Sequence, residues 1–183
     1  MRLIGLTGRA GAGKDTAAAA LVDAGYCQVA FADKLKRVVA ELAGEPVQNF
    51  YDRELKEAEC PALGMTRRRA LQEVGNEMRR VIHQGVWVNA VMHQWHNLGR
   101  PPTVISDVRY DSEAQAIIDN GGVVILIERP GAPALSGAAA QHVSERGVSL
   151  DLIETAIVND GSVEQLKALV LACMHTLEER HAR

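Results

Sequence analysis

Glycines and a lysine near the start of the chain are spaced for binding phosphate. Gly8, Gly13 and Lys14 satisfy the pattern G-x-x-x-x-G-K, and the small residues Gly11 and Ala12 lie between them. A loop of this kind can surround a triphosphate with backbone N–H groups, while the helix that follows directs the positive end of its dipole at the same anion. A turn that only joined a strand to a helix would not need the lysine. The spacing therefore predicts a phosphate-binding loop.

The residues on both sides of this loop supply the expected context. Residues 3–6 are apolar and predict a buried strand, and residues 16–22, with four alanines, predict a helix. The loop departs from the usual pattern after the lysine, where a Ser or Thr hydroxyl normally contacts Mg²⁺. Asp15 stands at that position and Thr16 follows it.

Strands and helices alternate along the rest of the chain. Further strands are predicted over residues 26–31, 103–106, 123–127 and 156–158. The wholly apolar run 123–127 is typical of a central parallel strand covered on both faces. Ser162 and Gln165 form a capping box that predicts the start of the last helix. We therefore expect an α/β fold with a central parallel sheet.

Two segments are longer than the connections that alternating strands and helices require. Residues 33–99 are far longer than a crossover, and residues 130–148 are rich in Pro, Gly, Ala and Ser. Because the second segment follows a central strand, we favour an active-site lid over a disordered insertion. The predicted organisation is a single domain, with a core of residues 1–32, 100–129 and 149–183, a helical insertion of residues 33–99 and a lid of residues 130–148.

The helix predicted over residues 66–82 carries three rows of side chains. The apolar row expected in the core is Leu71, Val74, Met78, Val81 and Ile82. Arg69, Asn76 and Arg80 are expected in solvent, with Arg69 paired to Glu73. The row between them is Arg68, Gln72, Gly75 and Arg79. Arginine matches phosphate oxygens with a planar fork and an amide can bind a base edge, so we favour a cleft wall over a solvated face for this row, with Gly75 allowing close approach.

Charged residues follow the predicted strands, at the edge where α/β sheets bind ligands. Asp33 is expected to cap a helix, to contact a ligand, or both, and Lys36 lies one turn further on. Asp107 is placed to hold Mg²⁺ through water and Arg109 to neutralise a transferring phosphoryl group. Arg129 is a second such cation, for which an ordinary ion pair is an equal alternative.

Composition limits the class of protein. The chain has 183 residues and a net charge of −3, which predicts one domain and argues against nucleic acid or an anionic membrane as partner. Neither a membrane-length apolar stretch nor a signal-peptide pattern is visible, so we expect a cytoplasmic protein. No His, Cys or Ser stands in a recognisable catalytic triad. A phosphate monoester acceptor needs no general base, because its second pKa of about 6 leaves it largely dianionic at neutral pH.

The ordered set of motifs resembles the bacteriophage-type deoxynucleoside monophosphate kinases, a family of P-loop kinases. The resemblance rests on residues 8–16, 31–36, 69–77, 87, 107–113, 121–131, 142–145 and 159–161. It implies a three-layer P-loop sandwich with a helical acceptor-binding insertion and a lid. The implied reaction transfers the γ-phosphoryl group of ATP to a deoxynucleoside 5′-monophosphate, a small-molecule nucleotide substrate, with Mg²⁺.

The same resemblance assigns roles to residues. ATP would be bound by Gly8, Arg9, Gly11, Ala12, Gly13, Lys14, Asp15 and Thr16, with Lys14 and Arg109 as catalytic cations. The position of Arg129 after a predicted strand adds it to them as a further candidate. The acceptor site would be lined by Asp33, Lys36, Arg68, Gln72 and Arg79. Mg²⁺ would be held by Asp107 and by Asp15, which alternatively orients Lys14. Trp87 would stack on the base or pack in the core. A homodimer is compatible with the family, with exposed apolar residues between Trp87 and Trp95 as its interface.

Two other functions remain open from the sequence. One is a P-loop kinase of another small metabolite, such as dephospho-coenzyme A; a hydroxyl acceptor would require a general base, for which Asp33 is the well-placed candidate. The other is a non-catalytic ATP-binding switch, suggested by Asp15 in place of a hydroxyl residue. The additional cations and the predicted lid argue against such a switch.

Overall fold

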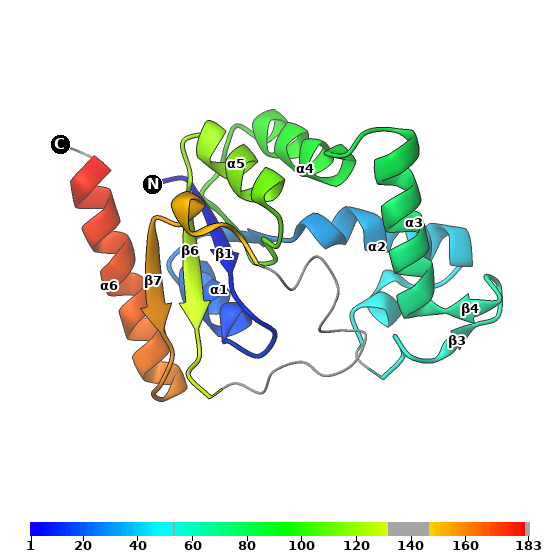
Figure 1. The fold of residues 1–183 in the computed structure, drawn as a ribbon, viewed down its shortest axis with the longest axis horizontal. Helices are drawn as coiled ribbons and strands as arrows, with labels where there is room; N and C mark the ends of the chain where they lie inside the picture. Colours follow the sequence, from blue (N-terminus) through cyan, green and yellow to red (C-terminus); the bar gives the residue numbers. More distant parts are fainter. Residues whose placement is uncertain (53, 132–146, 182–183) are drawn as a thin grey trace. The chain divides into compact units, whose positions relative to one another are not determined.

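The computed structural model describes residues 1–52, 54–131 and 147–181, and Figure 1 shows its elements. The chain divides into two compact units. The first, here the core unit, consists of Met1–Ala30 and Trp95–Arg183, and the second, the inserted unit, is Phe31–Gln94.

The core unit is built on a parallel sheet. Its strands are β1 (Leu3–Thr7), β2 (Cys27–Val29), β5 (Thr103–Ile105), β6 (Val123–Glu128) and β7 (Thr155–Val158). They are ordered β2-β5-β1-β6-β7, and each neighbouring pair is parallel. Ile4 of β1 lies opposite both Val104 and Val123, so β1 is the central strand. The expected α/β fold with a central parallel sheet is confirmed.

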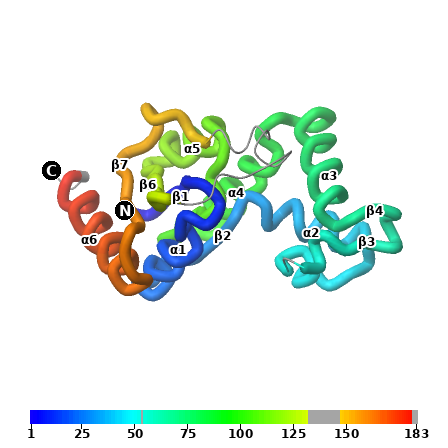
Figure 2. The backbone as a smooth tube through the Cα atoms, turned by 60° about the horizontal axis from the view of Figure 1, so that its bottom comes forward, coloured from blue at the N-terminus to red at the C-terminus, as the bar shows by residue number. Residues whose placement is uncertain are grey.

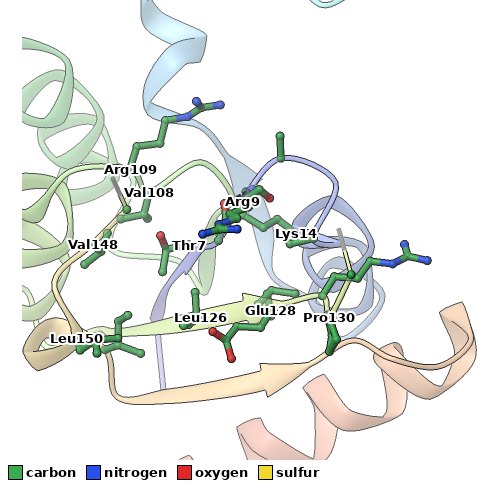
Figure 3. A pocket seen from close by; sticks show the side chains of 18 residues that line it. Thr7, Arg9, Lys14, Val108, Arg109, Leu126, Glu128, Pro130, Val148 and Leu150 are labelled. Atoms are coloured by element: carbon green, nitrogen blue, oxygen red, sulfur yellow. Dashed lines mark hydrogen bonds between the residues drawn. The ribbon is translucent and has the colours of Figure 1, made fainter. Parts of the chain in front are cut away.

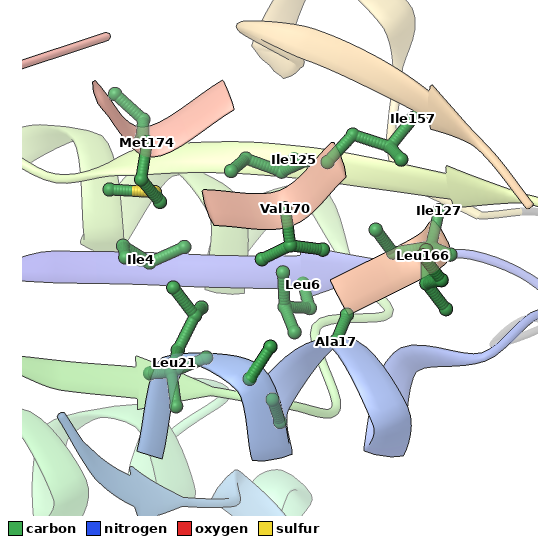
Figure 4. Close-up of a cluster of buried hydrophobic side chains, with 14 of the residues drawn as sticks. Ile4, Leu6, Ala17, Leu21, Ile125, Ile127, Ile157, Leu166, Val170 and Met174 are labelled. Atoms are coloured by element: carbon green, nitrogen blue, oxygen red, sulfur yellow. The ribbon is translucent and has the colours of Figure 1, made fainter. Parts of the chain in front are cut away.

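Helices cover both faces of this sheet. They are α1 (Lys14–Asp23), α5 (Asp111–Asp119) and α6 (Val163–His181), with a short 3-10 helix, η4 (Leu150–Leu152), before β7. Successive residues of a strand point to opposite faces. Ile4 and Leu6 therefore share a buried cluster with α1 and α6, which pack together on one face (Figure 2, Figure 4). On the other face, Ile117 of α5 lies 2.6 Å from where a side chain on Gly5 would begin.

The inserted unit is mainly helical. It contains α2 (Phe31–Ala43), the 3-10 helix η1 (Val47–Phe50), the antiparallel pair β3 (Glu59–Cys60) and β4 (Met65–Thr66), and α3 (Arg67–Val81). The helix α4 (Val86–Asn97) begins in this unit. Buried side chains of α2, η1 and α3, such as Val39, Phe50 and Ala70, form its own small core.

A buried arginine connects three parts of the inserted unit. The Arg67 guanidinium donates two hydrogen bonds of 2.7 Å to the two carboxylate oxygens of Glu45. Its remaining nitrogen donates to the backbone carbonyls of Leu55, Ala58 and Glu59. The hydrogen bonds that Glu45 accepts, chiefly those from Arg67, lower the pKa of its carboxyl group to about 2. The sequence predictions assigned no role to Arg67, which holds the segment before β3 against α3.

The start of α2 corrects one prediction. A strand was expected over residues 26–31 with Asp33 as the cap of the next helix, but β2 ends at Val29 and α2 begins at Phe31. The strand is short because it pairs on one side, with the three residues of β5. Phe31 is buried as the first residue of α2, so Asp33 lies in the first helical turn and is not the N-cap.

Two predictions about apolar residues were also wrong. Val81 and Ile82 were expected in the core row of α3, but they are 66% and 62% exposed because α3 ends there. The apolar residues between Trp87 and Trp95 were expected to be exposed as an interface, yet Trp87, Val88, Val91, Met92 and Trp95 are all buried. Across the described residues, no helix has the length and apolar character required to span a membrane.

Candidate active site

The glycines of the predicted phosphate loop adopt backbone conformations that other residues disfavour. Gly8, Gly11 and Gly13 have φ angles of 138°, 76° and 104°. A side chain on Gly8 would collide with the backbone carbonyl of Ile127, so the loop turns tightly against β6. Gly13 stands as the N-cap of α1 without a side-chain cap, which leaves the helix N-terminus available to an anion.

Lys14 bends back over the loop. It is the first residue of α1, and its Nζ donates to the carbonyls of Gly8 at 2.7 Å and Arg9 at 2.9 Å. The ammonium group is therefore held at the loop that the glycines shape. Asp15 and Thr16 follow in the first turn of α1, with Asp15 exposed.

A cavity of about 640 Å³ adjoins this loop (Figure 3). Among the described residues, four basic ones line it, Arg9, Lys14, Arg109 and Arg129, and one acidic one, Glu128. Apolar side chains, among them Val108, Leu126, Val148 and Leu150, line it as well. The volume falls within the range of small-molecule sites, and the charge favours an anionic ligand.

The segment after β5 delivers Asp107 and Arg109 to the carboxyl edge of the sheet. Val108 continues the strand pairing by donating its N–H to the carbonyl of Leu6 at 3.1 Å. The N–H of Arg109 donates to the buried carboxylate of Glu113 at 2.7 Å. Arg109 lines the cavity, and Asp107 is half-buried two residues earlier. Glu113, which fixes the backbone here, was not among the predicted site residues.

The predicted lid of residues 130–148 lies mostly outside the described residues, which omit 132–146. Its two described ends, Pro130 with Gly131 and Gly147 with Val148, line the cavity. Immediately after it, the N–H and Oγ of Ser149 donate to the Asp111 carboxylate at 2.8 and 2.7 Å. These bonds lower the pKa of Asp111 and hold the chain after residue 148 at the start of α5.

Within the inserted unit, Asp33 and Lys36 form a cluster with Tyr51. The Tyr51 hydroxyl donates to Asp33 at 2.6 Å, and Lys36 Nζ lies 3.5 Å from the same carboxylate oxygen. The ammonium group also stands 3.8 Å from the centre of the Tyr51 ring. Tyr51 was not among the predicted site residues, because it is 18 positions from Asp33 in sequence and meets it only in the folded chain.

The row predicted as a cleft wall on α3 is partly explained by packing within the unit. Gly75 is buried, because the side chain of Leu35 lies 3.0 Å from the position of its absent Cβ. The Trp87 indole N–H donates to the Gly75 carbonyl at 3.3 Å, and the ring is only 6% exposed. The sequence allowed Trp87 either to stack on a base or to pack in the core, and in the structure it packs in the core. The close approach at Gly75 is made by Leu35 and Trp87.

The polar members of that row lie nearer the surface. Arg68 and Gln72 are exposed and Arg79 is half-buried. Arg68 forms an ion pair with Glu57 at 2.5 Å, and the expected pair of Arg69 with Glu73 is present at 3.6 Å. A role for Arg68, Gln72 and Arg79 in binding an acceptor stays a prediction.

The core unit defines the class of protein. A parallel sheet whose first strand leads through a G-x-x-x-x-G-K loop into a helix is the arrangement of P-loop nucleotide-binding proteins. A dephospho-CoA kinase from Campylobacter jejuni has a similar fold, with a TM-score of 0.59, 15% identity, and coverage of 99% of this chain and 100% of that one. A Thermus thermophilus protein is also similar, with a TM-score of 0.52, 21% identity, and coverage of 96% and 97%. At these identities the likeness concerns the fold.

Sequence comparison then defines the family. The deoxynucleotide monophosphate kinase family matches residues 50–170 of the chain, a range that excludes the loop, so the match does not depend on that motif. A protein of Acanthamoeba polyphaga mimivirus, named as a candidate deoxynucleotide monophosphate kinase, is 34% identical over 191 residues, which cover 95% of this chain and 96% of the relative. The chain belongs to the deoxynucleotide monophosphate kinase family of phosphotransferases, which confirms the resemblance expected from its motifs.

Proposed function

We propose that the protein transfers the γ-phosphoryl group of ATP to a deoxynucleoside 5′-monophosphate, releasing ADP and the deoxynucleoside diphosphate. One observation carries the proposal: in a member of this kinase family, the Lys14 ammonium is held over the loop of residues 8–14, beside a cavity whose described charged residues are mostly cations. A site of this kind binds polyphosphate and favours movement of a phosphoryl group.

On the donor side, the backbone N–H groups of residues 8–16 would hold the ATP phosphates. Lys14 Nζ, which now donates to the Gly8 and Arg9 carbonyls, would donate instead to phosphate oxygens. Arg109 and Arg129 would neutralise charge on the transferring group. A phosphate dianion as acceptor needs no deprotonation, so positioning and these cations suffice.

When bound, Mg²⁺ supplies positive charge to the phosphate oxygens. Asp107 and Asp15 offer the carboxylate ligands that this ion prefers. No group of three His, Cys, Asp or Glu side chains able to cage a metal occurs in the described parts of the chain. This donor set fits an ion that is coordinated largely by substrate phosphates and water.

On the acceptor side, the candidates belong to the inserted unit: Asp33, Lys36, Arg68, Gln72 and Arg79. Lys36 and the arginines match a monophosphate, and Gln72 matches the edge of a base. Trp87 was a candidate for stacking on the base, but its burial and its hydrogen bond to Gly75 support a packing role.

A coupled assay of ADP release tests the proposal. The four common deoxynucleoside monophosphates are supplied with ATP and Mg²⁺, and dephospho-coenzyme A is supplied as the alternative acceptor. We expect turnover with at least one deoxynucleotide and none with dephospho-coenzyme A. Lys14→Ala should reduce kcat/KM on the order of 10²–10³-fold, while Lys167→Ala, which removes an exposed ion pair with Asp23, should leave it unchanged. Turnover with dephospho-coenzyme A alone would refute the proposal.

A further inference from the structure

Asn159 reaches the phosphate loop from the far end of the chain. Its side-chain nitrogen donates to the Ala12 carbonyl at 2.8 Å across 147 positions of sequence, and the residue is 7% exposed. The same nitrogen lies 2.5 Å from where a side chain on Gly13 would begin. The amide therefore packs directly against the Ala12–Gly13 peptide, in a space that the absence of a Gly13 side chain leaves open.

Asn159 is itself held firmly in place. It follows β7 directly, and its backbone N–H donates to the Glu128 carbonyl at 2.6 Å, which extends the pairing of β6 with β7. Three residues later the capping box of α6 begins: Ser162 Oγ accepts from the Gln165 N–H, and the Gln165 side chain accepts from the Ser162 N–H at 2.7 Å. A side chain anchored by a strand on one side and a capped helix on the other can impose an orientation on a loop.

The bond to Ala12 determines where the next N–H group points. In a trans peptide the C=O and N–H bonds point in opposite directions, and no cis peptide bond occurs in the described residues. The Ala12 carbonyl points toward Asn159, so the N–H of Gly13 points away from it. Ala12 lines the cavity, whereas Asn159 is not among the described lining residues.

We propose that Asn159 is a positioning residue that orients the Gly13 N–H for binding phosphate. The inference rests on the proposed function only in that the loop binds the ATP phosphates. Without the amide, the Ala12–Gly13 peptide would be free to rotate, and the loop would lose a preorganised donor. Because Asn159 acts through the peptide and not through the nucleoside, its effect should appear with a ligand that has no base.

The test measures binding of inorganic tripolyphosphate by titration calorimetry to the full-length protein and to three variants. Asn159→Ala should bind about tenfold more weakly, which equals ~1.4 kcal/mol. Asn159→Asp should bind more weakly still, because a carboxylate oxygen would face the Ala12 carbonyl at the position of the amide donor. Asn120→Ala is the matched control: it removes the same kind of bond, from a side-chain amide to the Ala116 carbonyl at 2.7 Å, at the end of α5, and should leave binding unchanged.

Steady-state kinetics add a second readout. Asn159→Ala should raise the KM for ATP about tenfold and change the KM for the acceptor less than twofold. If Asn159 served only packing, Asn159→Asp would bind tripolyphosphate more tightly than Asn159→Ala, because Asp has the shape of Asn whereas Ala leaves a cavity. Should Asn159→Asp fail to fold, the comparison of Asn159→Ala with Asn120→Ala decides alone.

Wild-type binding of tripolyphosphate by Asn159→Ala, or tighter binding by Asn159→Asp than by Asn159→Ala, would overturn the inference. The outcome for the proposed function is separate. If the wild-type protein binds tripolyphosphate but phosphorylates no deoxynucleotide, the proposed function fails while the ranking of the Asn159 variants still tests the inference.

Discussion

The cluster of Tyr51, Asp33 and Lys36 allows a graded test of the acceptor site. Tyr51→Phe removes the 2.6 Å hydrogen bond to Asp33 but keeps the ring beside the Lys36 ammonium. Tyr51→Leu removes both interactions. If Asp33 and Lys36 bind the acceptor, each step should loosen their placement and raise the KM for the deoxynucleotide.

The magnitudes follow from the exposure of the groups. A buried hydrogen bond to a charged group contributes about 1.5–3 kcal/mol, but Tyr51 is 45% and the Asp33 side chain 28% exposed, so we expect about 1 kcal/mol. The cation–π contact adds about 0.5–1 kcal/mol. Tyr51→Phe should therefore raise the acceptor KM by about fivefold, and Tyr51→Leu by about tenfold to thirtyfold.

The assay compares the KM of acceptor and donor in each variant. The KM for ATP should stay within twofold of wild type, because the cluster belongs to the inserted unit and the phosphate loop to the core unit. Tyr26→Phe is the control: it removes a tyrosine hydrogen bond, to the Met1 carbonyl at 2.9 Å, from the core unit. An unchanged acceptor KM in both Tyr51 variants, or equal changes in both substrates, would refute the role assigned to the cluster.

Two further predictions concern stability. Arg67 depresses the pKa of Glu45 to about 2 in the folded chain, from an ordinary value of 4.5. A carboxyl group whose pKa is lowered by folding stabilises the folded state at pH values above its unfolded pKa, and this stabilisation is lost on acidification. Thermal stability should therefore fall between about pH 4.5 and 2, and Glu45→Gln should flatten that dependence. Gly8→Ala should destabilise the fold by ~1–3 kcal/mol in urea titrations because of its φ of 138° and the collision with Ile127. Gly11→Ala, whose new side chain would meet nothing within 4 Å, should cost less; an equal cost would contradict the packing argument.

Features encoded in adjacent residues were predictable from the sequence. The phosphate loop, the apolar strands and the capping box of Ser162 with Gln165 depend on short spacings, and the structure contains each of them. Their physical causes are local: side-chain alternation, glycine conformations and the unsatisfied N–H groups of a helix start.

Features that depend on distant contacts were not predictable. Asn159 meets Ala12 only because β7 ends beside the loop, and Tyr51 meets Asp33 only because η1 folds back toward α2. Phe31 shows the same limit: its β propensity extended the predicted strand, but in the folded chain it is the buried first residue of α2.

The fate of the γ-phosphate tests the central claim most directly. The protein is incubated with Mg²⁺, ATP labelled in the γ-phosphate and each deoxynucleoside monophosphate, and the nucleotides are then separated. We predict that the label enters a deoxynucleoside diphosphate in equal amount to the ADP formed, and that Lys14→Ala lowers this rate on the order of 10²–10³-fold. Label found only in inorganic phosphate, or an undiminished rate in Lys14→Ala, would contradict the account.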